Sequence, residues 1–134
     1  MKCFRYGSTF SGNPLASAVA LAALDVIVDE ELPRRAADLG AKFEARFRAI
    51  KSPYFDTITG KGLFRSIYIH EGQSQGRVTG KRLAELCLKR GLLVNATGRR
   101  LRVCPALNID EGVMLEGVNI LENALKDLPE LDAL

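Results

Sequence analysis

Apolar residues recur at helical spacing over much of the chain, and this pattern predicts four helices. The first is expected over about 14–31, where Leu15, Val19 and Val26 fall on one stripe. Leu24 and several alanines widen its apolar surface, which predicts a helix that is buried on most sides. The other three helices each have one apolar stripe and are expected over about 33–50, over 78–90 and from the N-cap Asp110 to about 128.

Short runs of β-favouring residues lie between these helices. Strands are expected over 55–59, 63–70, 92–96 and 101–104. Gly60-Lys61-Gly62 is expected to form a bulge or tight bend and Thr97-Gly98-Arg99 a turn. Such short connections favour an antiparallel or mixed sheet of about four strands with the helices on one face. The pattern therefore predicts a single α+β domain over 1–134, in which a long helix precedes the small sheet.

Composition and charge narrow the class of protein. The chain has 134 residues, of which 47% are hydrophobic and 26% charged, and this fits one soluble globular domain with a sizeable core. The net charge of +3 is small and scattered, so it gives no case for nucleic acid. The apolar stretch 14–24 is too short to span a bilayer, and no apolar segment typical of a signal peptide is present.

The cysteines indicate the redox environment. Cys3, Cys87 and Cys104 are odd in number and widely spaced, which favours free thiols in a reducing compartment over a disulfide framework or a metal site. Cys87 and Cys104 are both expected to be small buried residues. These features predict a cytoplasmic protein with neither a membrane nor nucleic acid as its partner.

A loop rich in glycine and hydroxyl side chains precedes the first helix. It reads Gly7-Ser8-Thr9-Phe10-Ser11-Gly12-Asn13-Pro14-Leu15, in which Asn is a favoured N-cap and Pro a favoured first helical residue. Exposed N–H groups and hydroxyls in such a loop can hold a phosphate. The same residues are also ordinary loop chemistry, so on residue type alone a well-capped helix is the simpler interpretation.

This loop resembles Gly-Ser-Thr-(aromatic)-Gly-Gly-Asn-Pro-Leu of the class III aminotransferases. These are pyridoxal-phosphate enzymes that include ornithine and acetylornithine aminotransferase, and Ser11 takes the place of the first glycine of their pair. The resemblance implies that Ser8 and Thr9 contact the phosphate of the pyridoxal phosphate that the partner subunit of a homo-oligomer holds.

A second segment, Leu101-Arg102-Val103-Cys104-Pro105-Ala106-Leu107, contains the other candidate site residue. On the residues alone, Arg102 is readily explained as a surface charge, although arginine can also hold a carboxylate with two parallel hydrogen bonds. The segment resembles Arg-Phe-Ala-Pro-Pro-Leu of the same family, which implies that Arg102 binds the α-carboxylate of an amino-acid substrate. Val103, Cys104 and Ala106 depart from that pattern.

The resemblance extends over about 7–128, and Gly60-Lys61-Gly62-Leu63 and Leu92-Leu93-Val94-Asn95-Ala96-Thr97 belong to it. It implies the C-terminal small domain of a fold-type I aminotransferase. In that division, 7–31 are the phosphate-loop motif and a long connecting helix, and 32–134 are the small α+β domain.

The resemblance also indicates which catalytic groups are missing. Transamination needs a Schiff-base lysine and an acidic partner for the pyridine nitrogen. In the family both precede the Gly-Ser-Thr motif, and neither Lys2, Lys61 nor Lys81 can be assigned that role. We therefore expect no catalytic and no metal-binding residue in the chain.

Three hypotheses about function follow from this reading. The first is the C-terminal domain of an enzyme that transfers an amino group from an amino acid to a 2-oxo acid. The match favours ornithine or acetylornithine as the amino acid. As a truncated or split gene product, this domain would be inactive alone. The second is one subunit of a split pyridoxal-phosphate enzyme. The third is a stand-alone interaction or regulatory module. The expected protein partner is a second copy or a missing N-terminal aminotransferase part.

Overall fold

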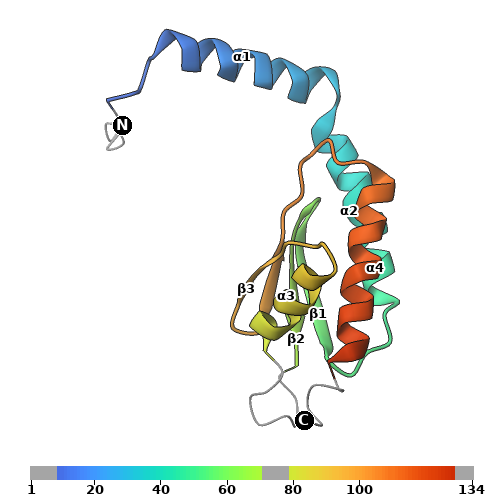
Figure 1. Cartoon of the computed structure of the whole chain (residues 1–134). Coiled ribbons are helices and arrows are strands. Elements are labelled where there is room, and N and C mark those ends of the chain that lie inside the picture. Colours follow the sequence, from blue (N-terminus) through green and yellow to red (C-terminus); the bar gives the residue numbers. More distant parts are fainter. Residues whose placement is uncertain (1–8, 71–78, 129–134) are drawn as a thin grey trace, which may run out of the picture. The chain divides into compact units, whose positions relative to one another are not determined.

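The computed structural model describes residues 9–70 and 79–128 of the chain. The chain divides after Leu32 into two compact units, each of which is described by itself. All eight predicted elements are found, with shifted ends (Figure 1). They are α1 (Pro14–Asp29), α2 (Leu32–Arg48), β1 (Phe55–Lys61), β2 (Phe64–Ile69), α3 (Gly80–Lys89), β3 (Asn95–Thr97), β4 (Arg100–Val103) and α4 (Glu111–Asp127).

The first unit consists mainly of α1, whose start follows the predicted capping chemistry. Asn13 Oδ1 accepts hydrogen bonds from the backbone N–H groups of Leu15 at 2.9 Å and Ala16 at 3.2 Å, and Pro14 stands at the first helical position. The helix ends at Asp29, two residues earlier than predicted, and Glu31 has a left-handed φ of 47°. No basic residue lies in the last turn to offset its acidic end.

The prediction that this helix is buried is wrong for the unit that contains it. No residue of α1 is buried, and Leu15, Val19 and Leu24 are 74%, 62% and 54% exposed. The sequence pattern indicates how apolar the surface of a helix is, but not whether another element covers that surface. Burial requires a second element that packs on this surface, and the described part of the first unit contains no such element.

The second unit is built on a four-stranded sheet in the order β1-β2-β4-β3, with all neighbouring strands antiparallel. Arg65, Ile67 and Ile69 of β2 are buried on one face, as period-two alternation requires. Buried residues of α2, α3 and α4 join the same core cluster, so these helices cover that face, as predicted. The largest fully buried side chains are Phe47, Ile67, Ile69, Leu83, Leu101, Leu121, Leu125, Leu128, Val118 and Cys87.

Strand register places polar side chains together on the opposite face of the sheet, which we call the polar face. Ser66 of β2 is paired with Arg102 of β4, and Arg102 in turn with Asn95 of β3. Cross-strand partners project from the same side of a sheet. The polar face comprises Thr57, Thr59 and Lys61 of β1, Phe64, Ser66 and Tyr68 of β2, Arg100 and Arg102 of β4, and Asn95 and Thr97 of β3.

Helices α2 and α4 lie side by side and run in the same direction (Figure 1). Salt bridges link them at two levels: Lys42 Nζ lies 2.8 Å from Glu111 Oε1, and Arg46 Nη2 lies 2.6 Å from Glu122 Oε2. The predicted N-cap Asp110 is confirmed at the start of α4, where its Oδ1 accepts from two backbone N–H groups of the first turn.

The turn between β1 and β2 lies later in the chain than predicted. Lys61 pairs with Phe64, so Gly62 and Leu63 form the two-residue turn, and Gly60 remains within the strand. Gly62 has a φ of 54°, which glycine adopts without the steric cost that other residues meet. The irregularity of β1 lies at Phe55–Thr57 rather than at the glycines.

A buried arginine ties this hairpin to α2. Arg65 is 8% exposed, and its Nη1 donates to Glu44 Oε2 at 2.6 Å. Its other donors reach three glycine carbonyl oxygens: those of Gly62 at 2.8 Å, Gly60 at 3.1 Å and Gly40 at 3.3 Å. We call these five residues the Arg65 junction. Because the guanidinium is paired and hydrogen-bonded on several sides, its burial is tolerated.

Glu44 of the junction also accepts hydrogen bonds from the exposed Arg48, one turn further along α2. The hydrogen bond from Arg48 and the charge of Arg65 together lower the pKa of the Glu44 carboxyl, although partial burial opposes the shift. The carboxylate is therefore the form that both arginines stabilise.

The end of α3 takes up Leu92, the first residue predicted for β3, and β3 begins three residues later than predicted. Gly91 has a φ of 87° after the C-cap, and its N–H donates to the Leu88 carbonyl. The Leu92 N–H donates to the Cys87 carbonyl at 2.9 Å. This is the hydrogen-bond pattern of a Schellman motif. The Leu92 N–H is therefore not available for pairing in the sheet, and the strand begins at Asn95.

Candidate cofactor and substrate contacts

Thr9 is exposed in the turn that precedes α1, and Ser8 lies outside the described residues. The first backbone donors of α1 are already used, since Asn13 Oδ1 accepts from Leu15 and Ala16 and the Asn13 carbonyl accepts from the Ser17 N–H. While Asn13 caps the helix, these N–H groups are not free for an anion. Outside the first turn of α1, Thr9 offers an exposed hydroxyl.

Arg102 is exposed on the polar face of the sheet. Its Nε donates to Cys104 Sγ at 3.3 Å, and its Cζ lies 4.9 Å from the ring centroid of Phe64. Among residues 9–70 and 79–128 it forms no salt bridge. A guanidinium with an unoccupied edge and no carboxylate partner is chemically suited to bind a carboxylate. Sequence reasoning identified Arg102 but not its contact with Phe64.

The two described cysteines have opposite environments. Cys87 is buried in the core, as predicted, and burial raises the pKa of its thiol to about 11. Cys104 is exposed, so the prediction that it is buried is wrong. Cys104 comes two residues after Arg102, so the alternation of β4 continues onto the polar face, and Arg102 Nε donates to its Sγ there.

This difference predicts selective alkylation. In the folded protein at pH 8, iodoacetamide should modify Cys104 and leave Cys87 unmodified, because Cys87 is both inaccessible and protonated. Mass spectrometry of tryptic peptides measures the two sites separately. In a urea-unfolded control both should react, and equal modification in the folded protein would contradict the buried position of Cys87.

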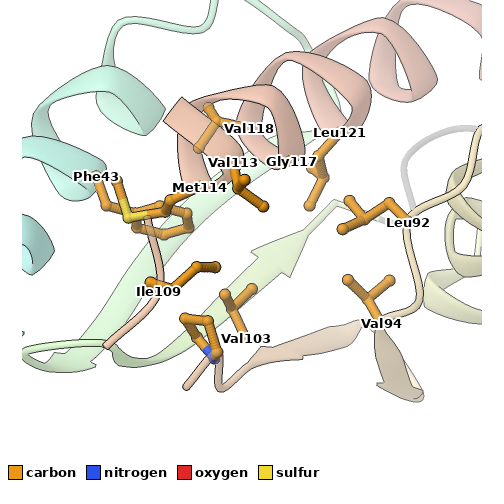
Figure 2. Close-up of a pocket in the computed structure, with 11 residues that line it drawn as sticks. Phe43, Leu92, Val94, Val103, Ile109, Val113, Met114, Gly117, Val118 and Leu121 are labelled. Atoms are coloured by element: carbon orange, nitrogen blue, oxygen red, sulfur yellow. The ribbon is translucent and has the colours of Figure 1, made fainter. Parts of the chain in front are cut away.

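A cavity of about 140 Å³ lies within the second unit, between the sheet and the helices (Figure 2). Its lining contains neither charged groups nor hydroxyls, so it offers no acid, base or nucleophile. It is suited to an apolar group rather than to catalysis. The lining residues are Phe43, Leu92, Val94, Val103, Pro105, Ile109, Val113, Met114, Gly117, Val118 and Leu121.

Residues 9–70 and 79–128 contain no group of three or more histidine, cysteine, aspartate or glutamate side chains that could hold a metal ion. Within the same ranges, no helix has the length and apolar character needed to span a bilayer.

Comparison with known proteins identifies the class of protein. The sequence model of the family "Aminotransferase class-III" matches residues 1–125. The chain therefore belongs to the class III aminotransferases. This confirms the resemblance of its motifs. The fold is that of a small α+β part of such an enzyme, because solved aminotransferases match this chain over only about a third of their own length.

Within the family, the similar proteins include ornithine and acetylornithine aminotransferases. The ornithine aminotransferase of Schizosaccharomyces pombe is 39% identical over 131 residues, which cover 95% of this chain and 29% of that protein. The mitochondrial ornithine aminotransferase of Arabidopsis thaliana is 38% identical over 132 residues, or 95% of this chain and 28% of the relative.

Solved structures agree with these relatives. The acetylornithine aminotransferase of Elizabethkingia anophelis has a TM-score of 0.80 and 37% identity, covering 95% of this chain and 32% of that one. The ornithine aminotransferase of Toxoplasma gondii, with pyridoxal phosphate partly occupying its active site, has a TM-score of 0.83 and 30% identity, covering 96% and 31%. This chain thus spans about three-tenths of the length of its relatives.

Membership of the family implies pyridoxal phosphate, and the described residues fit only part of that cofactor. Thr9 supplies a hydroxyl and Arg102 a guanidinium, but they belong to different units, each described by itself. The lining of the 140 Å³ cavity is apolar and contains neither a lysine nor a carboxylate. The described residues therefore offer a hydroxyl and a guanidinium rather than a complete cofactor site.

Proposed function

We propose that this chain is the C-terminal part of an ornithine or acetylornithine type of aminotransferase, which transfers an amino group from an amino acid to a 2-oxo acid. The observation that carries the proposal is that similarity to ornithine aminotransferases covers 95% of the chain but only 29% of the relative. The substrates belong to the complete enzyme. Free thiols at Cys87 and Cys104 support a cytoplasmic location.

In this proposal the chain contributes two binding contacts. Thr9, with Ser8 beside it, contacts the phosphate of pyridoxal phosphate held by a partner subunit, and the exposed position of Thr9 supports this role. Arg102 binds the α-carboxylate of the substrate, a role supported by its lack of a salt bridge among the described residues. When bound, the cofactor supplies an electron sink for the reacting carbon.

The 134 residues alone are proposed to be inactive, because no lysine among them matches the family's Schiff-base position. A titration with pyridoxal phosphate tests this. Aldimine absorbance is followed, the sample is reduced with borohydride, and adducts are located by mass spectrometry. We expect scattered labelling that does not saturate. One saturable lysine adduct at tight affinity would overturn the proposal.

Purification from cell extract separates the remaining alternatives. An amino-terminal aminotransferase chain that co-purifies with this one identifies a split enzyme, and in the reconstituted pair Thr9→Ala should weaken cofactor binding. In a stand-alone interaction or regulatory module, by contrast, Thr9→Ala leaves the activity unchanged. The inactive C-terminal part predicts that no such chain co-purifies.

The exposed apolar surface of α1 predicts self-association. Leu15 and Val19 are 74% and 62% exposed, and association would bury them. Sedimentation velocity at micromolar concentration should show a dimer or larger species. The double variant Leu15→Ser/Val19→Ser should shift it toward monomer, whereas Leu88→Ser, at an exposed leucine of α3, should not. A strictly monomeric unmodified chain would contradict the prediction.

A further inference from the structure

An aromatic ring lies beside Arg102 on the polar face of the sheet. Phe64 is 58% exposed, although hydrophobic burial favours a phenylalanine inside the core. Arg102 is paired with Ser66, two residues along β2 from Phe64, so Arg102 and Phe64 are diagonal neighbours. Diagonal neighbours lie within reach of aromatic and long side chains. The Arg102 Cζ indeed lies 4.9 Å from the centre of the Phe64 ring.

A second contact fixes one edge of the same guanidinium. Arg102 Nε donates to Cys104 Sγ at 3.3 Å. Nη1 and Nη2 donate to no atom of residues 9–70 or 79–128. The Phe64 ring thus contacts one face of the Arg102 guanidinium, and the Cys104 thiol contacts its Nε edge. The Nη1 and Nη2 donors at the outer edge remain unoccupied within the described part of the chain. Nη1 and Nη2 of an arginine together can bind a planar carboxylate with two parallel hydrogen bonds.

The neighbours of Arg102 favour an anion at this edge. Ser66 and Asn95 lie on either side of it across the sheet, and both are uncharged hydrogen-bonding residues. Arg100 lies two residues earlier on the same face of β4 and adds positive charge. None of the ten residues that define the polar face is acidic, and Asp56, in the irregular part of β1, is paired with Arg99 and not with Arg102.

We propose that Phe64 is a positioning residue that holds the guanidinium of Arg102 with its outer edge presented to the substrate carboxylate. The carboxylate part of this inference rests on the role of Arg102 in the proposed function. A free arginine side chain has many rotamers, and binding must restrict them. Contact with the ring restricts them before the ligand arrives, so less conformational freedom is lost on binding.

The contact can be tested in solution without catalysis. In the folded chain, the Arg102 Nε–H resonance should be displaced by the ring current of Phe64, and Arg102→Lys assigns it. Phe64→Leu should abolish the displacement, while Phe64→Tyr should retain it. Leu93→Ala, at an exposed leucine outside the polar face, is the matched control and should change nothing. Backbone amide spectra report whether each variant is folded.

Titration with glutarate at constant ionic strength then measures carboxylate binding at the same resonance. Phe64→Leu should weaken glutarate binding about two- to fivefold, the effect expected for one exposed cation–π contact. The inference would be overturned if the Arg102 Nε–H resonance is unchanged in the folded Phe64→Leu variant. It would also be overturned if this variant loses the ring-current displacement but binds glutarate with unchanged affinity. If the displacement is present but glutarate does not bind, Phe64 still positions Arg102 and the proposed carboxylate role fails.

Discussion

Replacing Arg65 by methionine should lower the free energy of unfolding by about 3 kcal/mol, because it removes one partner of a largely buried ion pair. Methionine keeps an unbranched side chain of similar reach but has no donors. Glu44 would lose its 2.6 Å partner, and the carbonyl oxygens of Gly40, Gly60 and Gly62 would lose theirs. Urea unfolding followed by circular dichroism measures the change.

Arg48→Ala is the matched control, since Arg48 contacts the same carboxylate from the other side. Its side chain is 54% exposed, and it donates to Glu44 Oε1 at 2.8 Å. An exposed pair of this kind contributes less than about 1 kcal/mol. Equal losses in the two variants would show that the carbonyl contacts and burial of Arg65 add nothing to its pairing with Glu44.

Gly40→Ala should be destabilising by about 3 kcal/mol, because an added methyl group overpacks the junction between α2 and the hairpin. A Cβ at Gly40 would lie 2.2 Å from the carbonyl oxygen of Gly62. That oxygen is backbone and is held by Arg65, so neither strand nor helix can move without breaking the junction. The usual preference for alanine inside a helix is therefore reversed at this position.

Gly117→Ala in α4 provides the opposite case within the same fold. A Cβ there would meet nothing closer than Leu92 Cδ1 at 3.6 Å, an ordinary van der Waals contact. Alanine should therefore stabilise the protein by about 0.5–1 kcal/mol through its helix propensity. Thermal unfolding should show a lower melting temperature for Gly40→Ala and a higher one for Gly117→Ala. A Gly40→Ala protein as stable as the unmodified chain would show that α2 and the hairpin are not in close contact.

Helix and strand positions could be predicted because the interactions that define them are local. Asn13 and Asp110 each cap a helix through donors two or three residues away, and Gly91 ends α3 through its own left-handed conformation. These contacts depend on sequence neighbours. The two hairpins were also predictable, since their glycine-containing connections are too short for parallel crossovers. The sequence left an antiparallel or a mixed sheet open, because β2 and β4 are joined through α3 and β3 and no short connection fixes their direction.

The family could be recognised from the motif that begins at Gly7 and from the segment around Arg102, and the match over residues 1–125 confirms it. The roles of Ser8, Thr9 and Arg102 stay predictions, because they depend on contacts with groups that a single chain does not contain. Sequence identified these residues as candidates, and it could not identify what each one touches.

The contacts of the arginines were decided by tertiary structure alone. Arg65 and Arg102 belong to the same type of residue on neighbouring strands, yet one is buried against Glu44 and the other is exposed beside Phe64. Which face each occupies depends on the register between β2 and β4, and a shift of one strand by one residue would place both arginines on the same face. The sequence by itself thus determined the elements, their caps and the family, through local interactions. Strand register and packing, which join residues far apart in the chain, decided that Cys104 is exposed, that α1 lacks cover in its own unit, and that Phe64 contacts Arg102.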